Sequence, residues 1–139
     1  MAKTKIFLID DDKFVLKATA KKFRAYDVEV FTFLDPVEAL KELVEHKPEI
    51  VFLDYNMPGL TGEELIVKVS EVKLFNHCSL YLLSGNDFDE NETVKLRTLG
   101  FYNVLKKPLD IKTIEDVFNM HLPEIPYAGA QQDLEKKSS

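Results

Sequence analysis

Three short apolar runs, each bounded by polar residues, are the clearest pattern in the sequence. They are IFLI at 6–9, IVFL at 50–53 and LYLL at 80–83. Continuous apolar runs of this length are typical of parallel strands that are covered on both faces. Two weaker runs, VEVFTF at 28–33 and FYNVL at 101–105, mix in polar residues and predict strands nearer the sheet edges.

Helical patterns lie between these runs, each with one apolar stripe. The stripes are Val15, Leu16, Thr19, Ala20 and Phe23 in the first helix, Val37, Leu40, Leu43 and Val44 in the second, Leu65, Ile66, Val69 and Val72 in the third, and Ile111, Ile114, Val117 and Phe118 in the fifth, at about 110–121. A fourth helix at about 88–99 has fewer apolar residues, compatible with shallow packing or a contact surface. The alternation of strands and helices predicts an α/β domain: a doubly wound, five-stranded parallel sheet with five helices on both faces.

Side chains that can cap a helix mark several of the predicted helix starts. Asp35 precedes Pro36, which suits the first helical position, and Thr61 precedes Glu64 by three residues. Asp12 is expected to cap the first helix in the same way.

Length and charge narrow the classes of protein to consider. The 139 residues fit one folded domain, expected over 1–122, and the prolines and charged end of 123–139 predict a mobile tail. With 18 basic and 24 acidic residues the net charge is −6, which disfavours direct binding to nucleic acid or to an anionic membrane surface.

Other features predict a cytoplasmic protein. The single cysteine, Cys78, cannot form an internal disulfide and is interpreted as a buried thiol. The sequence shows no signal-peptide pattern and no run near the roughly 18 apolar residues of a spanning helix. Six further residues are interpreted as structural or exposed, since the histidines lack metal-ligand spacing and the basic residues suit a solvated helix face: His46, His77, His121, Lys21, Lys22 and Arg24.

Five functional side chains come at the ends of predicted strands. Asp10 and Asp11 follow the first strand, Asp54 ends the third, Ser84 ends the fourth and Lys107 follows the fifth. Ligands of open parallel sheets bind beyond the carboxyl ends of the strands. The five groups are therefore expected to converge on one crevice.

Each of these residues also has a simpler interpretation. An Asp can cap a helix or form a turn, Ser84 can be a loop hydroxyl and Lys107 can be a solvated charge. A cap alone does not explain three adjacent acids, because neighbouring carboxylates disfavour each other's ionisation. Mg²⁺ does explain them, since it takes carboxylate oxygens as ligands, and Asp10, Asp11 and Asp54 supply suitable ones. Together the groups match phosphoryl transfer onto a carboxylate.

Four segments make the sequence similar to the receiver domain of two-component response regulators: LIDDDK, FLDYNMPGLTG, LLSGND and VLKKPLD. They occur in the order and spacing of that family, and the likeness covers about 4–122. It implies a flavodoxin-like fold with strand order 2-1-3-4-5. It also implies a phosphorylation-dependent switch that accepts a phosphoryl group from a histidine kinase or histidine phosphotransfer protein and changes its affinity for a downstream protein.

The resemblance further implies a role for each matching residue. Asp54 would be the phosphoacceptor, Asp11 a direct Mg²⁺ ligand, and Asp10 an acidic partner that reaches the metal directly or through water. The remaining matches are the backbone carbonyl of Asn56 as a metal ligand, Ser84 and Lys107 as partners of the phosphoryl group, and Gly85 as the position that leaves room for its approach.

One position departs from the family pattern. Val104 stands where the family commonly has Tyr or Phe as a rotamer switch, so the usual aromatic readout is not expected. Strand alternation predicts Tyr102 on the same side as Val104 and not in its place.

Two other classes compete with the signalling switch. A Mg²⁺-dependent phosphatase acting through an aspartyl-phosphate would need a general acid and a substrate lid, and the sequence indicates neither. An interaction module that no longer uses phosphate is disfavoured by the intact set of five groups. The chain is therefore not expected to be an enzyme beyond its own phosphoryl transfer and dephosphorylation.

Overall fold

The structure is a computed structural model that describes residues 4–55, 64, 78–85 and 88–121. The predicted third helix, the Asn56 carbonyl and the predicted tail at 123–139 lie outside the described residues.

The described residues form a parallel sheet with the predicted strand order β2-β1-β3-β4-β5. Its strands are β1 (Thr4–Ile9), β2 (Val28–Phe33), β3 (Ile50–Asp54), β4 (Ser79–Ser84) and β5 (Asn103–Lys106). β5 begins two residues after the predicted start. The reason is that Phe101, which follows the end of the preceding helix, still donates its backbone N–H to the carbonyl of Leu96 in that helix.

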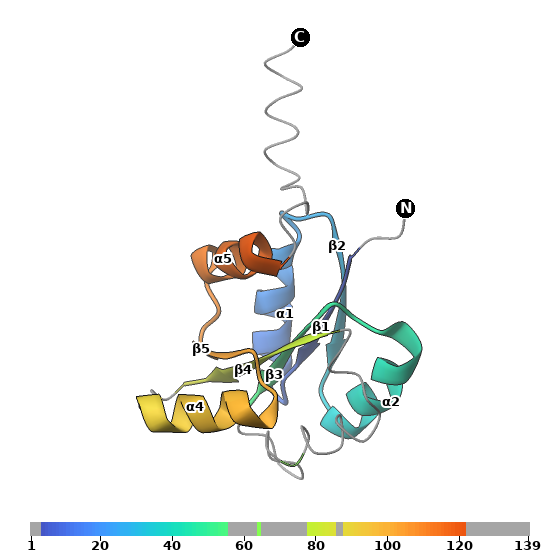
Figure 1. The fold of residues 1–139 in the computed structure, drawn as a ribbon. Helices are drawn as coiled ribbons and strands as arrows, with labels where there is room; N and C mark the ends of the chain where they lie inside the picture. The colour runs from blue at the N-terminus through green and yellow to red at the C-terminus, as the bar shows by residue number, and fades with distance from the viewer. Residues whose placement is uncertain (1–3, 56–63, 65–77, 86–87, 122–139) are drawn as a thin grey trace.

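Helices cover both faces of this sheet, as Figure 1 shows. They are α1 (Lys13–Phe23), α2 (Pro36–His46), α4 (Glu90–Leu99) and α5 (Ile111–His121). Side chains of α1 and α5 pack on one face together with Ile6, Leu8 and Phe52. Side chains of α2 and α4 pack on the other face with Phe7 and Leu53. The predicted doubly wound α/β architecture is therefore confirmed.

The central strands explain why the three apolar runs dominate the sequence. Every residue of β3 is buried, and the side chains of β1 from Ile6 to Ile9 are at most 2% exposed. Successive residues of a strand point to opposite faces, so a strand between two helical layers needs apolar residues at every position. Burial of these side chains is the main stabilising contribution that holds the strand ends in fixed places.

The helix predictions were right for α1 and partly wrong for α2. In α1, Leu16, Thr19 and Phe23 are buried, as the predicted stripe requires. In α2 the buried stripe is Pro36, Ala39 and Leu43, whereas Val37 and Val44 are 44% and 52% exposed. The stripe is rotated because Pro36 and Ala39, which carry little hydrophobic signal, are small enough to sit closest to the sheet. Ile111, at the start of α5, is likewise exposed.

Helix caps fix the loops that leave the strands. The Asp12 carboxylate accepts hydrogen bonds from the backbone N–H groups of Phe14 and Val15, at 2.9 and 3.2 Å. The Asp35 carboxylate accepts one from Val37, at 2.9 Å, with Pro36 in the first turn. Both predicted caps are confirmed, and the one at Asp12 orients the loop that carries Asp10 and Asp11.

Candidate functional site

Asp10, Asp54 and Lys107 meet at the carboxyl edge of the sheet. The Lys107 Nζ lies 2.7 Å from Asp10 Oδ2 and 3.0 Å from Asp54 Oδ1. Asp10 follows β1, Asp54 ends β3 and Lys107 follows β5, so three separate strands deliver these groups. The convergence predicted for these three residues is thus present.

Burial sets the electrostatics of this cluster. The side chains of Asp10 and Asp54 are only 4% and 7% exposed, and that of Lys107 is 22% exposed. Burial by itself lowers the pKa of Lys107, but hydrogen bonds and charge attraction from Asp10 and Asp54 outweigh it, so its pKa lies above the usual value. Lys107 therefore stays protonated and bridges the two carboxylates.

The β1–α1 loop holds its three acids in different roles. Asp10 Oδ1 accepts a hydrogen bond from the backbone N–H of Asp12 at 2.9 Å, and Asp12 in turn caps α1. Asp11 lies between them and is exposed. Asp10 thus points into the site, Asp12 caps the start of α1, and Asp11 remains accessible from solvent.

The donor set fits a Mg²⁺ ion. One carboxylate oxygen from each of Asp10, Asp11 and Asp54 lies within 4.8 Å of the others. Three carboxylates and one ammonium give a formal charge of −2, from −3 plus +1, which a divalent cation would neutralise. Hard oxygen donors of this kind, with positions left for water, are what Mg²⁺ requires. The structure also shows what the sequence did not indicate: Lys107 already neutralises part of this charge.

Ser84 ends β4 beside these groups, and Gly85 follows it. The side chain of Ser84 is 1% exposed, and its carbonyl accepts a hydrogen bond from the backbone N–H of Lys107 at 2.8 Å. That bond ties the end of β4 to the residue that bridges the carboxylates. A Cβ built on Gly85 meets nothing within 4 Å, so the space beside it is open in the described part of the structure.

Val104 lies on the α4 side of the sheet, partly buried against the cluster that contains Leu96 and Phe101. The prediction that Tyr102 shares its side was wrong. The Tyr102 ring packs against Tyr81, with centroids 5.4 Å apart, and Tyr81 belongs to the opposite cluster. Tyr102 precedes the first residue of β5, so the alternation of a strand does not apply to it.

Two residues near the site were not identified from the sequence. Lys22 was interpreted as part of a solvated face, but its Nζ donates to the carbonyl of Leu109 at 2.7 Å and so links α1 to the loop after Lys107. No local signal reveals a contact across 87 positions. Phe14, beside the acidic loop, is 82% exposed, and its absence from the apolar stripe of α1 was the available clue.

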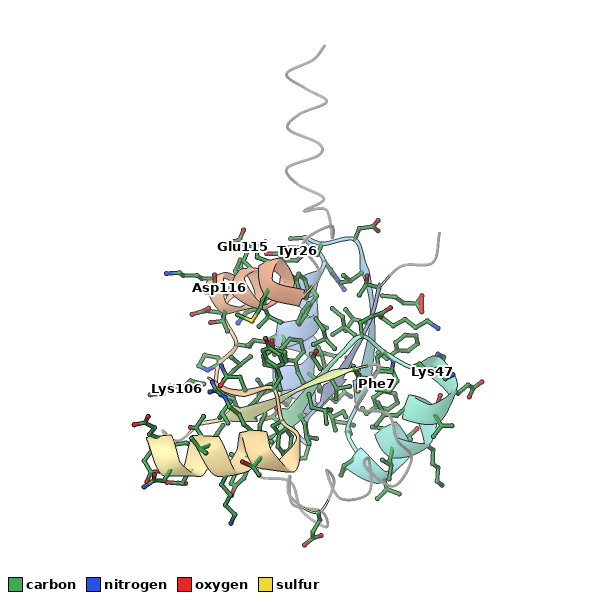
Figure 2. All side chains as sticks on the ribbon, viewed as in Figure 1. Phe7, Tyr26, Lys47, Lys106, Glu115 and Asp116 are labelled. Carbon is green, nitrogen blue, oxygen red and sulfur yellow. The ribbon has the colours of Figure 1, made fainter. Side chains whose placement is uncertain are left out.

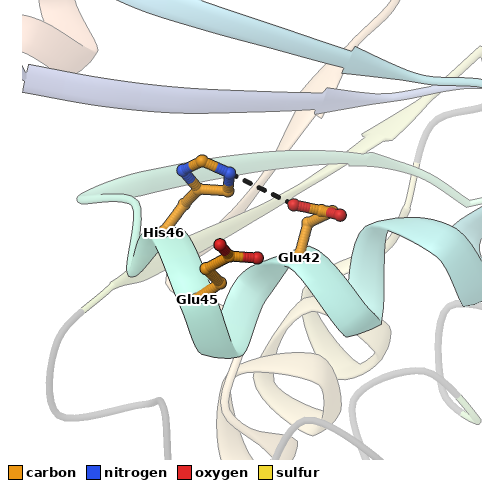
Figure 3. Close-up of side chains that lie close together, drawn as sticks. All are labelled: Glu42, Glu45 and His46. Atoms are coloured by element: carbon orange, nitrogen blue, oxygen red, sulfur yellow. Dashed lines mark ion pairs between the residues drawn. The ribbon is translucent and has the colours of Figure 1, made fainter.

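A second cluster of possible metal ligands lies on α2. Glu42, Glu45 and His46 have ligand atoms within 4.8 Å of one another, and His46 Nε2 lies 3.1 Å from Glu42 Oε2 (Figure 3). Its His46 ring packs on Phe31, with centroids 4.6 Å apart. His77 and the side chain of His121 lie outside the described residues. Cys78 is partly buried, and burial raises its pKa to about 11, which agrees with a thiol of low reactivity.

The helices of the described residues include none that is long and apolar enough to span a membrane.

Among known proteins, the chain is similar to Protein PilG of Pseudomonas aeruginosa, with 26% identity over 86% of this chain and 87% of PilG. It is 24% identical to Sporulation initiation phosphotransferase F of Bacillus subtilis, over 88% of this chain and 97% of that protein. The transcriptional regulatory protein PrrA of Mycobacterium tuberculosis is 36% identical over 75% of this chain but only 43% of PrrA.

Solved structures share the fold. A two-component response regulator from Cytophaga hutchinsonii matches with a TM-score of 0.76 and 26% identity, over 89% of this chain and 100% of that one. The Vibrio cholerae chemotaxis protein CheY4 matches with a TM-score of 0.77 and 21% identity, over 87% and 100% of the two chains. The sequence pattern of one family matches residues 6–119, nearly all of the described domain. The chain therefore belongs to the response regulator receiver domain family.

Proposed function

We propose that this domain accepts a phosphoryl group on Asp54 from a phosphohistidine donor and thereby changes its affinity for a protein partner. The observation that carries the proposal is the position of Asp54, which is buried, ends a central strand, and lies 3.0 Å from the Lys107 ammonium. Family membership supports the same switch function.

The chemistry needs few groups. An Asp54 oxygen forms a bond to phosphorus as the bond from phosphorus to the donor imidazole nitrogen breaks, and that nitrogen keeps the bonding electron pair. Lys107 would neutralise charge on the phosphoryl oxygens and Ser84 would donate a hydrogen bond to one of them. A Mg²⁺ ion held by Asp10, Asp11 and Asp54 would supply further charge neutralisation, with the Asn56 carbonyl proposed as another ligand.

A docking surface for the donor lies next to these groups. Phe14 is 82% exposed on the first turn of α1, three residues after Asp11. An exposed aromatic side chain commonly anchors a protein interface. We therefore propose that the surface around Phe14, on the first turn of α1, contacts the histidine kinase or phosphotransfer protein that delivers the phosphoryl group.

The response to phosphorylation would run through the backbone. Lys107 and Ser84 are joined by a 2.8 Å backbone hydrogen bond, so attraction of both side chains to a phosphoryl group would move the ends of β4 and β5 together. Val104 has a single side-chain torsion and no polar end, so its rotation would change little exposed area. The proposed output face is therefore formed by α4, β5 and α5, and its change on phosphorylation would be a movement of the backbone.

The phosphatase alternative has less support. It requires a general acid near the nucleophile, whereas the Asp54 carboxylate lies 3.0 Å from the ammonium of Lys107, a lysine whose pKa is raised. A protonated lysine of that kind stabilises an acyl phosphate better than it protonates a leaving group.

Phosphoryl transfer from acetyl phosphate tests the proposal. With Mg²⁺ present, mass spectrometry should show one added phosphoryl group per chain, labile to hydroxylamine and to alkali, as expected of an acyl phosphate. Asp54→Ala should show none, whereas Glu115→Ala, on the exposed face of α5, should label as the parent does. Equal labelling of Asp54→Ala would refute the assignment, and continuous release of many phosphates from small phosphomonoesters would favour the phosphatase.

A further inference from the structure

A groove of about 680 Å³ lies between α1 and the carboxyl end of β2 (both labelled in Figure 1). Its cationic lining comes from Lys13, Lys17 and Lys21 on successive turns of α1 and from Arg24, the C-cap residue of that helix. The spacing of four, four and three residues places these side chains in one row along the helix. Asp10, Asp11, Asp54, Ser84 and Lys107 are not among the described residues that line the groove.

The charge of this row is not balanced from within the described part of the domain. α1 contains four lysines and no acidic residue, and Glu38 is the one acid among the described residues that line the groove. Ion pairs of the four cations with described carboxylates are absent, although the whole chain has a net charge of −6. Like charges at this spacing destabilise a helix. An anionic partner would remove that repulsion.

The rest of the lining indicates what form the partner takes. Apolar side chains contribute to the groove, including Leu16, Ala20 and the half-exposed Leu34. Beside them runs β2, an edge strand that pairs with β1 alone among the described strands. An edge strand can add an extended segment through backbone hydrogen bonds, and apolar contacts on alternate side chains add to its affinity.

We propose that this groove binds an extended, acidic protein segment with interspersed apolar residues, which lies beside the carboxyl end of β2 and against α1. Charge complementarity commits the proposal to an acidic polypeptide: the four cations in a row match carboxylates spaced along the segment. The apolar part of the lining and the strand edge favour a polypeptide over a nucleic acid, whose phosphates have no use for either.

Binding of a defined probe to the full chain tests this. The probe is a fluorescein-labelled twelve-residue peptide of alternating Glu and Val, measured by anisotropy. Lys17→Glu/Lys21→Glu should weaken its binding by at least about tenfold, because two attractive contacts become repulsive. Lys41→Glu/Lys112→Glu has the same charge change on exposed helical lysines outside the groove and should bind like the parent.

Three outcomes would overturn the proposal. They are equal weakening by both double variants, equal affinity for a Lys–Val peptide of the same length, and binding of a single-stranded oligonucleotide in place of the acidic peptide. Amide chemical shifts place the contact, which should lie at residues 13–24 and 28–34. Phosphorylation of Asp54 by acetyl phosphate should be unchanged in both double variants. A failure of the groove proposal can therefore be distinguished from a failure of the phosphoryl-transfer proposal.

Discussion

Among the described residues, two clusters each bring three possible metal ligands within 4.8 Å of one another, yet the clusters differ in origin. Asp10, Asp11 and Asp54 come from two strand ends far apart in the sequence, and two of them are buried. Glu42, Glu45 and His46 belong to one turn of α2, and none of them is fully buried. Residues three and four apart on a helix are neighbours by geometry alone, so their proximity says nothing about a ligand.

The difference teaches which proximity needs an explanation. Burying two carboxylates costs free energy, and the fold offsets this cost with a lysine from a third strand. Replacing such groups with apolar ones would keep or raise stability, so their presence points to chemistry. The α2 cluster involves less of this cost, because its side chains are partly or fully exposed. Figure 2 shows other charged side chains in exposed positions on the helices, such as Glu115 and Asp116.

Removing one ligand from each cluster should give the largest contrast. Asp11→Asn should weaken Mg²⁺ binding by at least about tenfold, because a site with so few charged protein ligands loses one of them. Glu45→Gln should leave Mg²⁺ affinity unchanged. Titration of both variants by isothermal calorimetry checks this, and an Asp11→Asn protein that binds Mg²⁺ like its parent would remove Asp11 from the ligand set.

Lys107→Met, which removes the cation of the aspartate cluster, should lower the free energy of unfolding. Without the ammonium, two buried carboxylates face each other without its neutralising charge, and the free energy of unfolding should fall by about 1–3 kcal/mol in the absence of metal. Saturating Mg²⁺ should restore part of this loss, since the cation replaces the lost charge. Urea unfolding with and without Mg²⁺ measures both effects, with Lys112→Met as an exposed control. A loss that Mg²⁺ does not reduce would contradict the shared-charge account.

The same lysine predicts a pH dependence. Its pKa is raised in the folded state, so the stability it contributes is fully present below its ordinary pKa of 10.5 and is lost as pH rises through the higher folded value. The difference in unfolding free energy between parent and Lys107→Met should therefore stay constant from pH 7 to 10 and shrink above that range. A difference that grows with alkaline pH would have the wrong sign.

The sequence predicted the parts of the fold that depend on local pattern. Continuous apolar runs identified the buried strands, and the polar residues that follow them identified Asp10, Asp54, Ser84 and Lys107 as one group. Strand ends carry this information because a parallel sheet brings them to one edge whatever the loops do.

What the sequence missed depends on contacts between distant residues. The hydrogen bond from Lys22 to Leu109 and the packing of Tyr102 on Tyr81 have no local signature, since each depends on how helices and strands settle against one another. The rotated stripe of α2 has the same cause, because the residues of α2 that approach the sheet most closely include the small Pro36 and Ala39 and not the larger valines. The burial of each side chain, which only the structure supplies, is also what distinguishes the aspartate cluster from the cluster on α2.

The smallest effect is expected from the α2 cluster itself. Glu42→Gln removes the carboxylate that faces His46 Nε2 but leaves the His46 ring against Phe31, so the free energy of unfolding should change by less than about 0.5 kcal/mol, the value of a solvated pair one turn apart. Thermal unfolding with added Zn²⁺ provides the sharper measurement, because zinc prefers a site with histidine and carboxylate ligands. If Zn²⁺ raised the unfolding temperature of the parent and not of Glu42→Gln, helix geometry alone would no longer explain the cluster, and the contrast between the two regions would fail.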